Sequence, residues 1–354
     1  MNAQFTQHNL IFKQASGTSR GVLTTKETYL LEISKNDKKG IGECAIFRGL
    51  SYDDVPDYEE KLTWLCENIH LDFEVLKKEL LHYPSIIFGL EQALLNLEHG
   101  EDLYFPSDFT DGKDSIKING LIWMGNADFM QSQIEEKLAK GFDCIKLKIG
   151  VDWKSEKEII KKLREKFPKE QLELRVDANG AFSYEEARMV LQELADLGIH
   201  SIEQPIKKSE VRSPKSEENS EINSTDYCAP WNEMAKLCAE TPTPIALDEE
   251  LIGVIDFEEK KKLLETIKPQ YIILKPALVG GFSGSDEWIV LAESLGIDWW
   301  ITSALESNIG LNAICQYTYT KKNPLPQGLG TGALFTNNFE THLQLEGDQM
   351  WHKK

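Results

Sequence analysis

The sequence predicts an α/β protein in two parts, an α+β region followed by a β/α barrel. From about residue 115, short apolar runs alternate with segments of helical periodicity, which is typical of parallel strands joined by helices. About eight such runs recur, most at intervals of about 25–30 residues, and this number favours a closed barrel over an open sheet. The residues before them lack this repeat and predict a separate α+β region.

The expected barrel strands are short apolar runs. They are Ile118–Trp123, Cys144–Ile149, Leu172–Val176, His200–Glu203, Pro244–Leu247, Tyr271–Leu274 and Ile297–Thr302, with a weaker eighth near Gln327–Gly330. Between them, apolar residues recur at helical spacing, as in Ala187, Val190, Leu191 and Leu194. The two patterns together predict alternating strands and helices.

The N-terminal region predicts antiparallel strands at Glu27–Ile33 and Gly40–Ala45, and helices at Asp57–Ile69 and Ile86–Leu97. The stretch Phe105–Lys113 is typical of a linker. We therefore expect a capping domain at 1–113 and a barrel at 114–334, with the tail 335–354 packing back on the first domain.

One polar run interrupts the barrel pattern between the fourth and fifth strands. Lys207–Tyr227 is rich in Ser, Glu, Lys and Asn. A flexible surface insertion is the expected structure, and an active-site lid is the alternative.

Composition excludes several classes of protein. The chain has 354 residues, of which 41% are hydrophobic, and its 39 Lys and Arg against 58 Asp and Glu give a net charge of −19. Such a charge does not suit nucleic acid, and the absence of a long apolar run or signal-peptide pattern predicts no membrane partner. Six dispersed cysteines without C-x-x-C indicate reduced thiols in a cytoplasmic protein. No H-E-x-x-H pattern occurs, which favours an oxygen-ligated metal over a histidine-ligated zinc.

Five consecutive expected strands each end in a charged side chain. In chain order these are Lys148, Asp177, Glu203, Asp248 and Lys275. A single charge would be an ordinary solvated strand end. Five in succession indicate an active site, because the C-terminal strand ends of a parallel barrel form its floor.

The three carboxylates predict a magnesium site. Asp177, Glu203 and Asp248 lie on neighbouring strands, so their side chains can converge. Carboxylates packed together repel one another unless a cation lies between them. Ligation by oxygen alone favours Mg²⁺, with Mn²⁺ as an alternative ion and with water or substrate completing the octahedron.

The two lysines predict acid/base chemistry. Lys148 and Lys275 end the second and sixth strands, which are opposite in an eight-stranded ring, and Lys146 shares the strand face of Lys148. A neighbouring ammonium and a metal would lower the pKa of Lys148 and make it a base. This arrangement suits removal of a proton next to a carboxylate, with the cation stabilising the enediolate that forms.

Five ordered motifs resemble those of the enolase superfamily, in its muconate-lactonizing subgroup. They are K-x-K at Lys146–Lys148, V-D-A-N at Val176–Asn179, I-E-Q-P at Ile202–Pro205, L-D-E at Leu247–Glu249 and K-P at Lys275–Pro276. The resemblance implies a modified TIM barrel of the (β/α)7β type with an α+β N-terminal capping domain. The loops Ala15–Val22 and Ala45–Ser51 would then lie over the barrel mouth. It also implies that the three carboxylates bind Mg²⁺ and that Lys148 and Lys275 are the catalytic pair.

Within this subgroup, Thr302–Gly310 and Gln327–Gly332 are similar to the o-succinylbenzoate synthases of menaquinone biosynthesis. These lyases dehydrate 2-succinyl-6-hydroxy-2,4-cyclohexadiene-1-carboxylate to 2-succinylbenzoate. Lys148 would remove the α-proton and assist loss of hydroxide, while Lys275 would stabilise the intermediate. The expected substrate-binding residues are Lys146, Asn179, Ser303, Glu306, Ser307 and Asn308. For residues 303–310 the alternative is an ordinary turn capped by Ser307.

Two other functions remain open. An N-acylamino-acid racemase or dipeptide epimerase would use the same scaffold and both lysines. Dipeptide epimerases carry D-x-D at the eighth strand end, where this chain has only glycines, Leu329 and Thr331, so the sequence disfavours a substrate with a free amine. A non-catalytic barrel would be expected to have lost one of the five charged residues. A small carboxylate is therefore the expected partner, and a homo-oligomer stays open.

Overall fold

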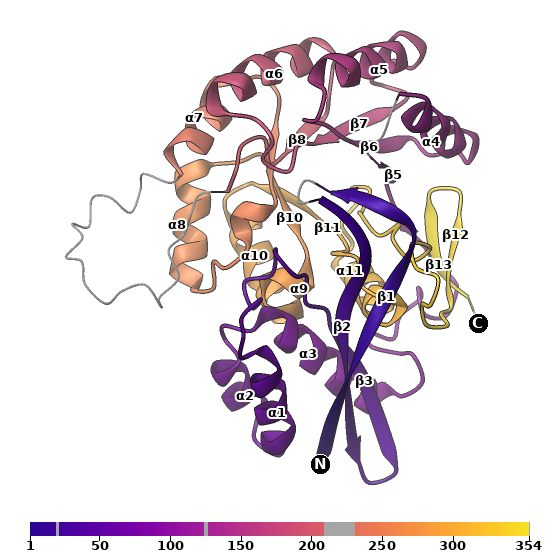
Figure 1. Ribbon diagram of the computed structural model, residues 1–354, viewed down its shortest axis with the longest axis vertical. Coiled ribbons are helices and arrows are strands. Elements are labelled where there is room, and N and C mark those ends of the chain that lie inside the picture. Colours follow the sequence, from indigo (N-terminus) through magenta and orange to yellow (C-terminus); the bar gives the residue numbers. More distant parts are fainter. Residues whose placement is uncertain (19–20, 124–126, 209–230, 354) are drawn as a thin grey trace, which may run out of the picture.

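The computed structural model describes residues 1–18, 21–123, 127–208 and 231–353. An N-terminal antiparallel sheet with three helices lies against a curled parallel sheet, and helices form an arc outside that sheet (Figure 1). Each part has its own large group of buried apolar side chains. None of the helices in the described ranges has the length and apolar composition needed to cross a bilayer.

The N-terminal sheet has the order β1-β2-β3 and is antiparallel throughout. Its strands are β1 (Asn2–Thr18), β2 (Gly21–Lys35) and β3 (Lys38–Cys44). The two strands expected from the sequence coincide with parts of β2 and with β3. Strand β1 was not predicted, because most of its described side chains are exposed and its residues alternate too weakly in polarity.

Three helices follow, α1 (Tyr58–Asn68), α2 (Phe73–Glu79) and α3 (Pro84–His99). Helix α3 packs closely on β3, where two glycines leave room for it. A Cβ at Gly40 would lie 2.1 Å from the carbonyl oxygen of Ala93, and a Cβ at Gly42 would lie 2.0 Å from that of Gly89. These positions therefore require glycine if the helix is to approach the sheet.

The parallel sheet has seven strands in the order β11-β10-β9-β8-β7-β6-β5. They are β5 (Gly120–Ile122), β6 (Cys144–Lys148), β7 (Glu173–Asp177), β8 (Ser201–Glu203), β9 (Ile245–Leu247), β10 (Tyr271–Leu274) and β11 (Asp298–Ile301). Every one overlaps an expected strand. Strands buried on both faces give continuous apolar runs, which is why these seven could be located from the sequence.

Helices alternate with these strands along the chain. They are α4 (Ala127–Ala139), α5 (Trp153–Lys166), α6 (Tyr184–Asp196), α7 (Asn232–Glu240), α8 (Phe257–Ile267), α9 (Pro276–Val279), α10 (Gly281–Ser294) and α11 (Asn308–Lys321). Helix α6 shows how they begin and pack. Ser183 and Glu186 form a capping box at its start, and all four apolar residues predicted for its inner face are buried.

The eighth position of the ring differs from the expected weak strand. Among the described residues, the segment near Gln327–Gly330 forms no regular strand and makes only isolated bridges, from Gln327 to Ile118 and from Gly328 to Thr302. These bridges join the two edges of the seven-stranded sheet. Gly328 fits tightly there, since a Cβ would lie 2.4 Å from Oγ1 of Thr302.

The C-terminal tail contacts both parts of the molecule. Near its start, Thr336 donates to the carbonyl oxygen of Ile11 in β1 at 2.9 Å. The tail then forms a hairpin, β12 (Leu343–Glu346) and β13 (Gln349–His352), and β13 pairs with the short strand β4 (Ile116–Lys117). The predicted insertion Lys207–Tyr227 falls almost wholly outside the described residues, which omit 209–230.

Candidate active site

The charged strand ends come together at one edge of the parallel sheet. In the strand register Lys148 is paired with Asp177, and Asp177 with Glu203. On the next strand Glu203 is paired with Ala246, two residues before Asp248. The side chains of the three acids are each only 2% exposed, so they lie beneath the surface.

Lysine side chains neutralise these carboxylates. Nζ of Lys146 lies 3.0 Å from Oδ2 of Asp177 and also donates to Glu203. Lys148 approaches the same Oδ2 of Asp177 at 3.2 Å, from the cavity side. Across the site, Lys275 pairs with Asp248 and lies 4.0 Å from Oε1 of Glu203. Lys148 and Lys275 therefore flank the carboxylates from strands β6 and β10, with three strands between them.

Electrostatic coupling shifts the pKa values of this cluster in opposite directions. Burial raises the pKa of Glu203 and the charge of Asp177 raises it further, so it lies well above its ordinary value. Burial would also raise the pKa of Asp177, but the lysines beside it outweigh burial and hold it below the usual range. Burial lowers the pKa of Lys275, and its carboxylate neighbours more than compensate, so the net pKa is raised. The lysines therefore keep Asp177 ionised, and the carboxylates keep Lys275 protonated.

The side-chain amide of Asn179 links Lys148 to Glu249 by two hydrogen bonds. Oδ1 of Asn179 accepts a hydrogen bond from Lys148 at 2.5 Å, and Nδ2 donates to Oε1 of Glu249 at 3.1 Å. Asn179 has φ of 44°, a left-handed conformation that asparagine tolerates better than most residues. Burial raises the pKa of Glu249 to about 7. Glu249 was not among the expected site residues, although it follows Asp248 directly.

A cavity opens over this cluster. Its lining includes the lysines, Asp177, Asn179 and Ser303 of the expected site, together with Glu249. Phe47 and Leu50 reach it from the predicted capping loop Ala45–Ser51, and Trp123 adds a third apolar wall. The remaining lining residues were not among the expected site residues, although six of them lie in the stretches Thr302–Gly310 and Gln327–Gly332 that resemble the synthases. They are Asn119, Leu121, Thr302, Ala304, Leu305, Gly328, Gly330 and Thr331. Charged groups on the floor and apolar walls above suit a small anion with a hydrophobic body.

The predicted substrate residues after β11 divide into two groups. Ser303 lines the cavity, where its Oγ accepts from Thr331 at 2.7 Å and donates to Glu306 at 2.6 Å. Glu306 is fully buried and accepts from the amide of Ala304, so it supports the loop from beneath. Asn308 donates to the carbonyl oxygen of Phe339 in the C-terminal tail. Neither Glu306 nor Asn308 is among the residues that line the cavity.

Ser307 is held by a carboxylate of the capping sheet. Its hydroxyl accepts from the amide of Ile309 as the N-cap of α11, and donates to Oε2 of Glu43 at 2.6 Å. Glu43 also accepts from the amides of Ser307 and Gly310. Ser307 thus fits the alternative of a capped turn, and it joins the barrel to the N-terminal sheet.

The carboxylate cluster fits a hard divalent cation. Asp177, Glu203 and Asp248 supply oxygen atoms only, and no histidine or cysteine is among the residues that line the cavity. Oε1 of Glu203 is buried and has no hydrogen-bond partner among the described residues. A buried carboxylate oxygen without a donor is costly, and a cation would satisfy it.

Comparisons with known proteins agree with this architecture. A family described as "Enolase C-terminal domain-like" matches residues 130–216. The chain is 42% identical over 380 residues to an o-succinylbenzoate synthase of Desulfotalea psychrophila, covering 98% of each chain. The crystal structure of MenC from Desulfotalea psychrophila LSv54 superposes with a TM-score of 0.84 at 39% identity, covering 99% of both chains.

A second relative has a different activity in its name. An N-succinylamino acid racemase of Thermus thermophilus is 33% identical over 312 residues, covering 83% of this chain and 75% of the relative. The chain belongs to the enolase superfamily, in its muconate-lactonizing subgroup.

Proposed function

We propose that this chain is an o-succinylbenzoate synthase, a hydro-lyase of menaquinone biosynthesis. The observation that carries the proposal is its end-to-end similarity to a synthase of this activity, at 42% identity over 98% of both chains. The site adds a chemical reason, because Lys148 and Lys275 flank a carboxylate cluster below a mostly apolar cavity.

The reaction removes water from a ring. The substrate, 2-succinyl-6-hydroxy-2,4-cyclohexadiene-1-carboxylate, loses the proton next to its ring carboxylate and then the neighbouring hydroxyl. The electron pair of the broken C–H bond forms the third double bond of the ring as the C–O bond breaks. The product is aromatic, which makes the elimination favourable.

Lys148 is the proposed base and acid of this reaction. As a neutral amine it takes the α-proton, and the resulting ammonium returns that proton to the departing hydroxyl, so water leaves and the amine is regenerated. Asn179 and Asp177 both accept hydrogen bonds from Nζ of Lys148 and so position it. Lys275 has a raised pKa and stays an ammonium, which stabilises negative charge on the far face of the ring.

The carboxylates have a different role in this proposal. Enolase superfamily members bind Mg²⁺. In this chain Asp177, Glu203 and Asp248 would hold it, because they are buried carboxylates at the ends of three neighbouring strands. Bound there, Mg²⁺ would supply positive charge for the substrate carboxylate as the enediolate forms.

The walls of the cavity suit the rest of the substrate. Phe47, Leu50 and Trp123 offer apolar contact for the ring. Lining hydroxyls of Ser303 and Thr302 suit the succinyl group, and Oγ1 of Thr302 has no hydrogen-bond partner among the described residues. A buried hydroxyl of this kind is available to donate to a ligand.

The direct test is an absorbance assay with purified protein, Mg²⁺ and the cyclohexadiene substrate. The proposal predicts the ultraviolet absorbance of the benzoate product, dependent on added Mg²⁺. Protein that binds Mg²⁺ and is fully folded yet yields no product would contradict it.

A second activity, racemisation of N-acylamino acids, is favoured by the racemase relative and by the two lysines on opposite sides of the site. Incubation of N-succinylamino acids in deuterated water measures it directly, because exchange at the α-carbon introduces deuterium. Rapid deuteration with slow dehydration would make racemisation the principal activity. Deuteration at a lower rate than dehydration would make it a side reaction of the synthase.

Two further proposals concern the domain boundaries and the cellular location of the protein. We propose residues 1–113 as the capping domain and 114–334 as the barrel, supported by the separate buried groups of the two parts. A cytoplasmic location is supported by the five described cysteines, all of which are free thiols.

A further inference from the structure

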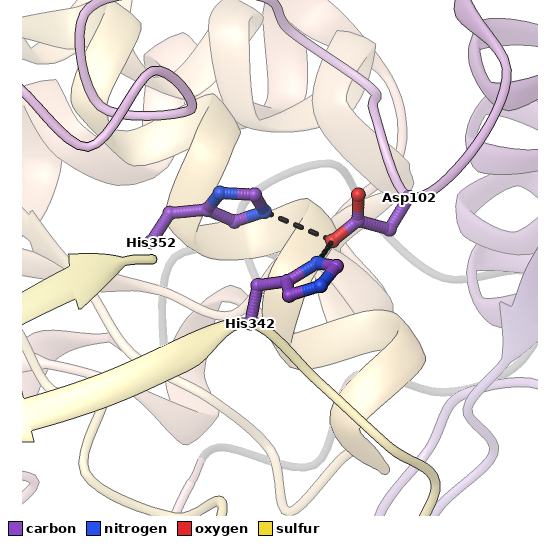
Figure 2. A group of neighbouring side chains, drawn as sticks. All are labelled: Asp102, His342 and His352. Carbon is purple, nitrogen blue, oxygen red and sulfur yellow. Dashed lines mark hydrogen bonds and ion pairs between the residues drawn. The ribbon is translucent and has the colours of Figure 1, made fainter. Parts of the chain in front are cut away.

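A second cluster of ionisable side chains lies outside the parallel sheet. Asp102 follows α3, His342 precedes β12, and His352 ends β13 (Figure 2). Oδ2 of Asp102 lies 2.7 Å from Nδ1 of His342 and 2.9 Å from Nε2 of His352. All three of these atoms lie within 4.8 Å of one another.

The backbone around the cluster is held firmly. Two amide side chains of α11, those of Asn312 and Gln316, donate to the carbonyl oxygen of Asp102 at 2.9 and 2.8 Å. The hairpin places the histidines side by side, because His352 is paired with Leu343 and the amide of Lys353 donates to the carbonyl oxygen of His342. The three side chains therefore converge through fixed segments, as the ligands of a prebuilt site do.

The cluster is closed on one side and open on the other. His352 is fully buried, with its ring 5.9 Å from that of Phe109, whereas the side chain of His342 is 44% exposed. An ion could therefore enter from the side of His342. Water could complete its coordination there.

Hydrogen bonding within the described residues leaves the cluster incompletely satisfied. Both imidazoles share a single carboxylate oxygen, Oδ2, while Oδ1 of Asp102 is buried without a hydrogen-bond partner. Among the described lysines and arginines, none forms an ion pair with Asp102. A half-buried carboxylate that faces two imidazoles, with one oxygen buried and unpartnered, has the composition of a metal-ligand set.

We propose that Asp102, His342 and His352 bind a divalent transition metal, of which zinc is the reference ion. Two imidazole nitrogens and one carboxylate oxygen are ligands that zinc accepts, with water in the fourth position. Ligands at about 2.0–2.1 Å in a tetrahedral site stand about 3.3 Å apart. The observed separations of 2.7 and 2.9 Å need only a small widening to admit the ion.

This site would differ from the barrel site in both selectivity and role. The barrel carboxylates offer only oxygen, which suits Mg²⁺, whereas a mixed nitrogen and oxygen set favours zinc, nickel or copper. The ion would tie the C-terminal hairpin to the segment after α3 and, through Asn312 and Gln316, to α11. Its expected effect is stabilisation of the fold, since an ion that binds only the folded chain raises the unfolding temperature.

The test uses the full chain, stripped of metal with a chelator and kept in excess Mg²⁺ so that the barrel carboxylates are saturated. Zinc is then titrated and followed by calorimetry, by metal analysis after gel filtration and by thermal unfolding. The proposal predicts one equivalent of zinc per chain and a rise in unfolding temperature on zinc addition.

His342→Gln is the informative variant, because this side chain is partly exposed and its loss should not prevent folding. His8→Gln is the matched control: His8 is also hydrogen-bonded, to Asn337, but lies in β1. Zinc binding and the thermal shift should disappear in His342→Gln and persist in His8→Gln. Absence of zinc binding by the wild type in Mg²⁺, or equal binding by His342→Gln, would show a hydrogen-bonded cluster only and overturn the proposal.

Discussion

Two groups of buried carboxylates in this molecule differ in their hydrogen-bond donors. At the barrel mouth Asp177 and Asp248 face lysine ammonium groups from neighbouring strands. Between the two parts of the molecule, Glu43 and Glu91 face backbone amides at the starts of α11 and α10. The amides of a helix N-terminus and the ammonium of a lysine both satisfy a carboxylate, but only the lysine can also transfer a proton.

Carboxylates with lysine donors therefore suit a reaction, whereas carboxylates with amide donors suit a fixed contact between the two parts of the molecule. Lysines leave a site whose charges can rearrange around a substrate or a cation. Helix amides are fixed, so Glu43 and Glu91 hold the N-terminal part against the barrel in one arrangement. Variants in the first region should therefore change activity with little effect on stability, and variants in the second should do the reverse.

The largest expected effect is that of Lys148→Ala. Removing the proposed base should lower kcat of the dehydration by at least about 10²–10⁴-fold, the range that a positioned acid/base group contributes. The unfolding temperature should change little, because Lys146 still neutralises Asp177. Lys117→Ala is the control, since that lysine pairs with Asp143 at the surface and should leave kcat unchanged. Activity of Lys148→Ala within tenfold of wild type would place the base elsewhere.

Asp248→Asn should raise the Mg²⁺ concentration needed for half-maximal activity by at least about tenfold, because one charged ligand of the proposed site is replaced by a neutral one. Titration of activity with Mg²⁺ measures this. Glu43→Gln provides the contrast, since it removes a buried carboxylate that lies outside the cluster and should leave the Mg²⁺ requirement unaltered. Equal Mg²⁺ requirements in Asp248→Asn and the wild type would remove Asp248 from the ligand set.

Glu43→Ala should lower the free energy of unfolding by about 3–5 kcal/mol. It leaves the amides of Ser307 and Gly310 and the hydroxyl of Ser307 without this acceptor in a fully buried place. Urea denaturation measures the change, and Glu43→Gln, which keeps one acceptor oxygen, should lose less. A loss below about 1 kcal/mol for Glu43→Ala would mean that the two parts do not depend on this contact.

Glu91 makes stability depend on pH. Burial raises the pKa of its carboxyl to about 7 in the folded chain, against about 4.3 when unfolded. Because the folded chain holds the Glu91 proton more tightly than the unfolded chain, the protonated carboxyl favours folding at a pH below the unfolded pKa. This contribution to the free energy of unfolding is lost as the pH rises towards 7. Between pH 4.5 and pH 7.5 the wild type should lose roughly 2–4 kcal/mol of unfolding free energy relative to Glu91→Gln. Parallel curves for the two proteins over this range would show that Glu91 does not titrate there.

The sequence allowed the parallel sheet and its charged strand ends to be predicted because both signals are local. Each strand is a continuous apolar run, and each charge stands immediately after one. Strand β1 and helix α2 were missed because their side chains are largely polar or exposed. The hairpin β12–β13 was missed for the same reason, since most of β12 is exposed.

Roles that depend on a distant partner could not be predicted. Ser307 was expected to bind substrate because the stretch Thr302–Gly310 resembles that of the o-succinylbenzoate synthases. Its hydroxyl instead donates to Glu43, which lies 264 residues earlier in the chain. Asp102 and His352 likewise meet from positions 250 residues apart, and no local pattern marks them. Contacts of this kind follow from the fold and become visible only once it is known.

Gly328, at the eighth position of the ring, limits which substitutions could give this site a different substrate. The resemblance to the muconate-lactonizing subgroup implies two aspartates at that place in an enzyme that binds a free amine. A side chain at Gly330 would meet nothing closer than 3.5 Å, so a first acid could be accommodated there. A side chain at Gly328 would collide with Thr302, which would have to become smaller first. Placing an acid at Gly328 therefore requires a smaller residue at position 302, whereas placing one at Gly330 does not.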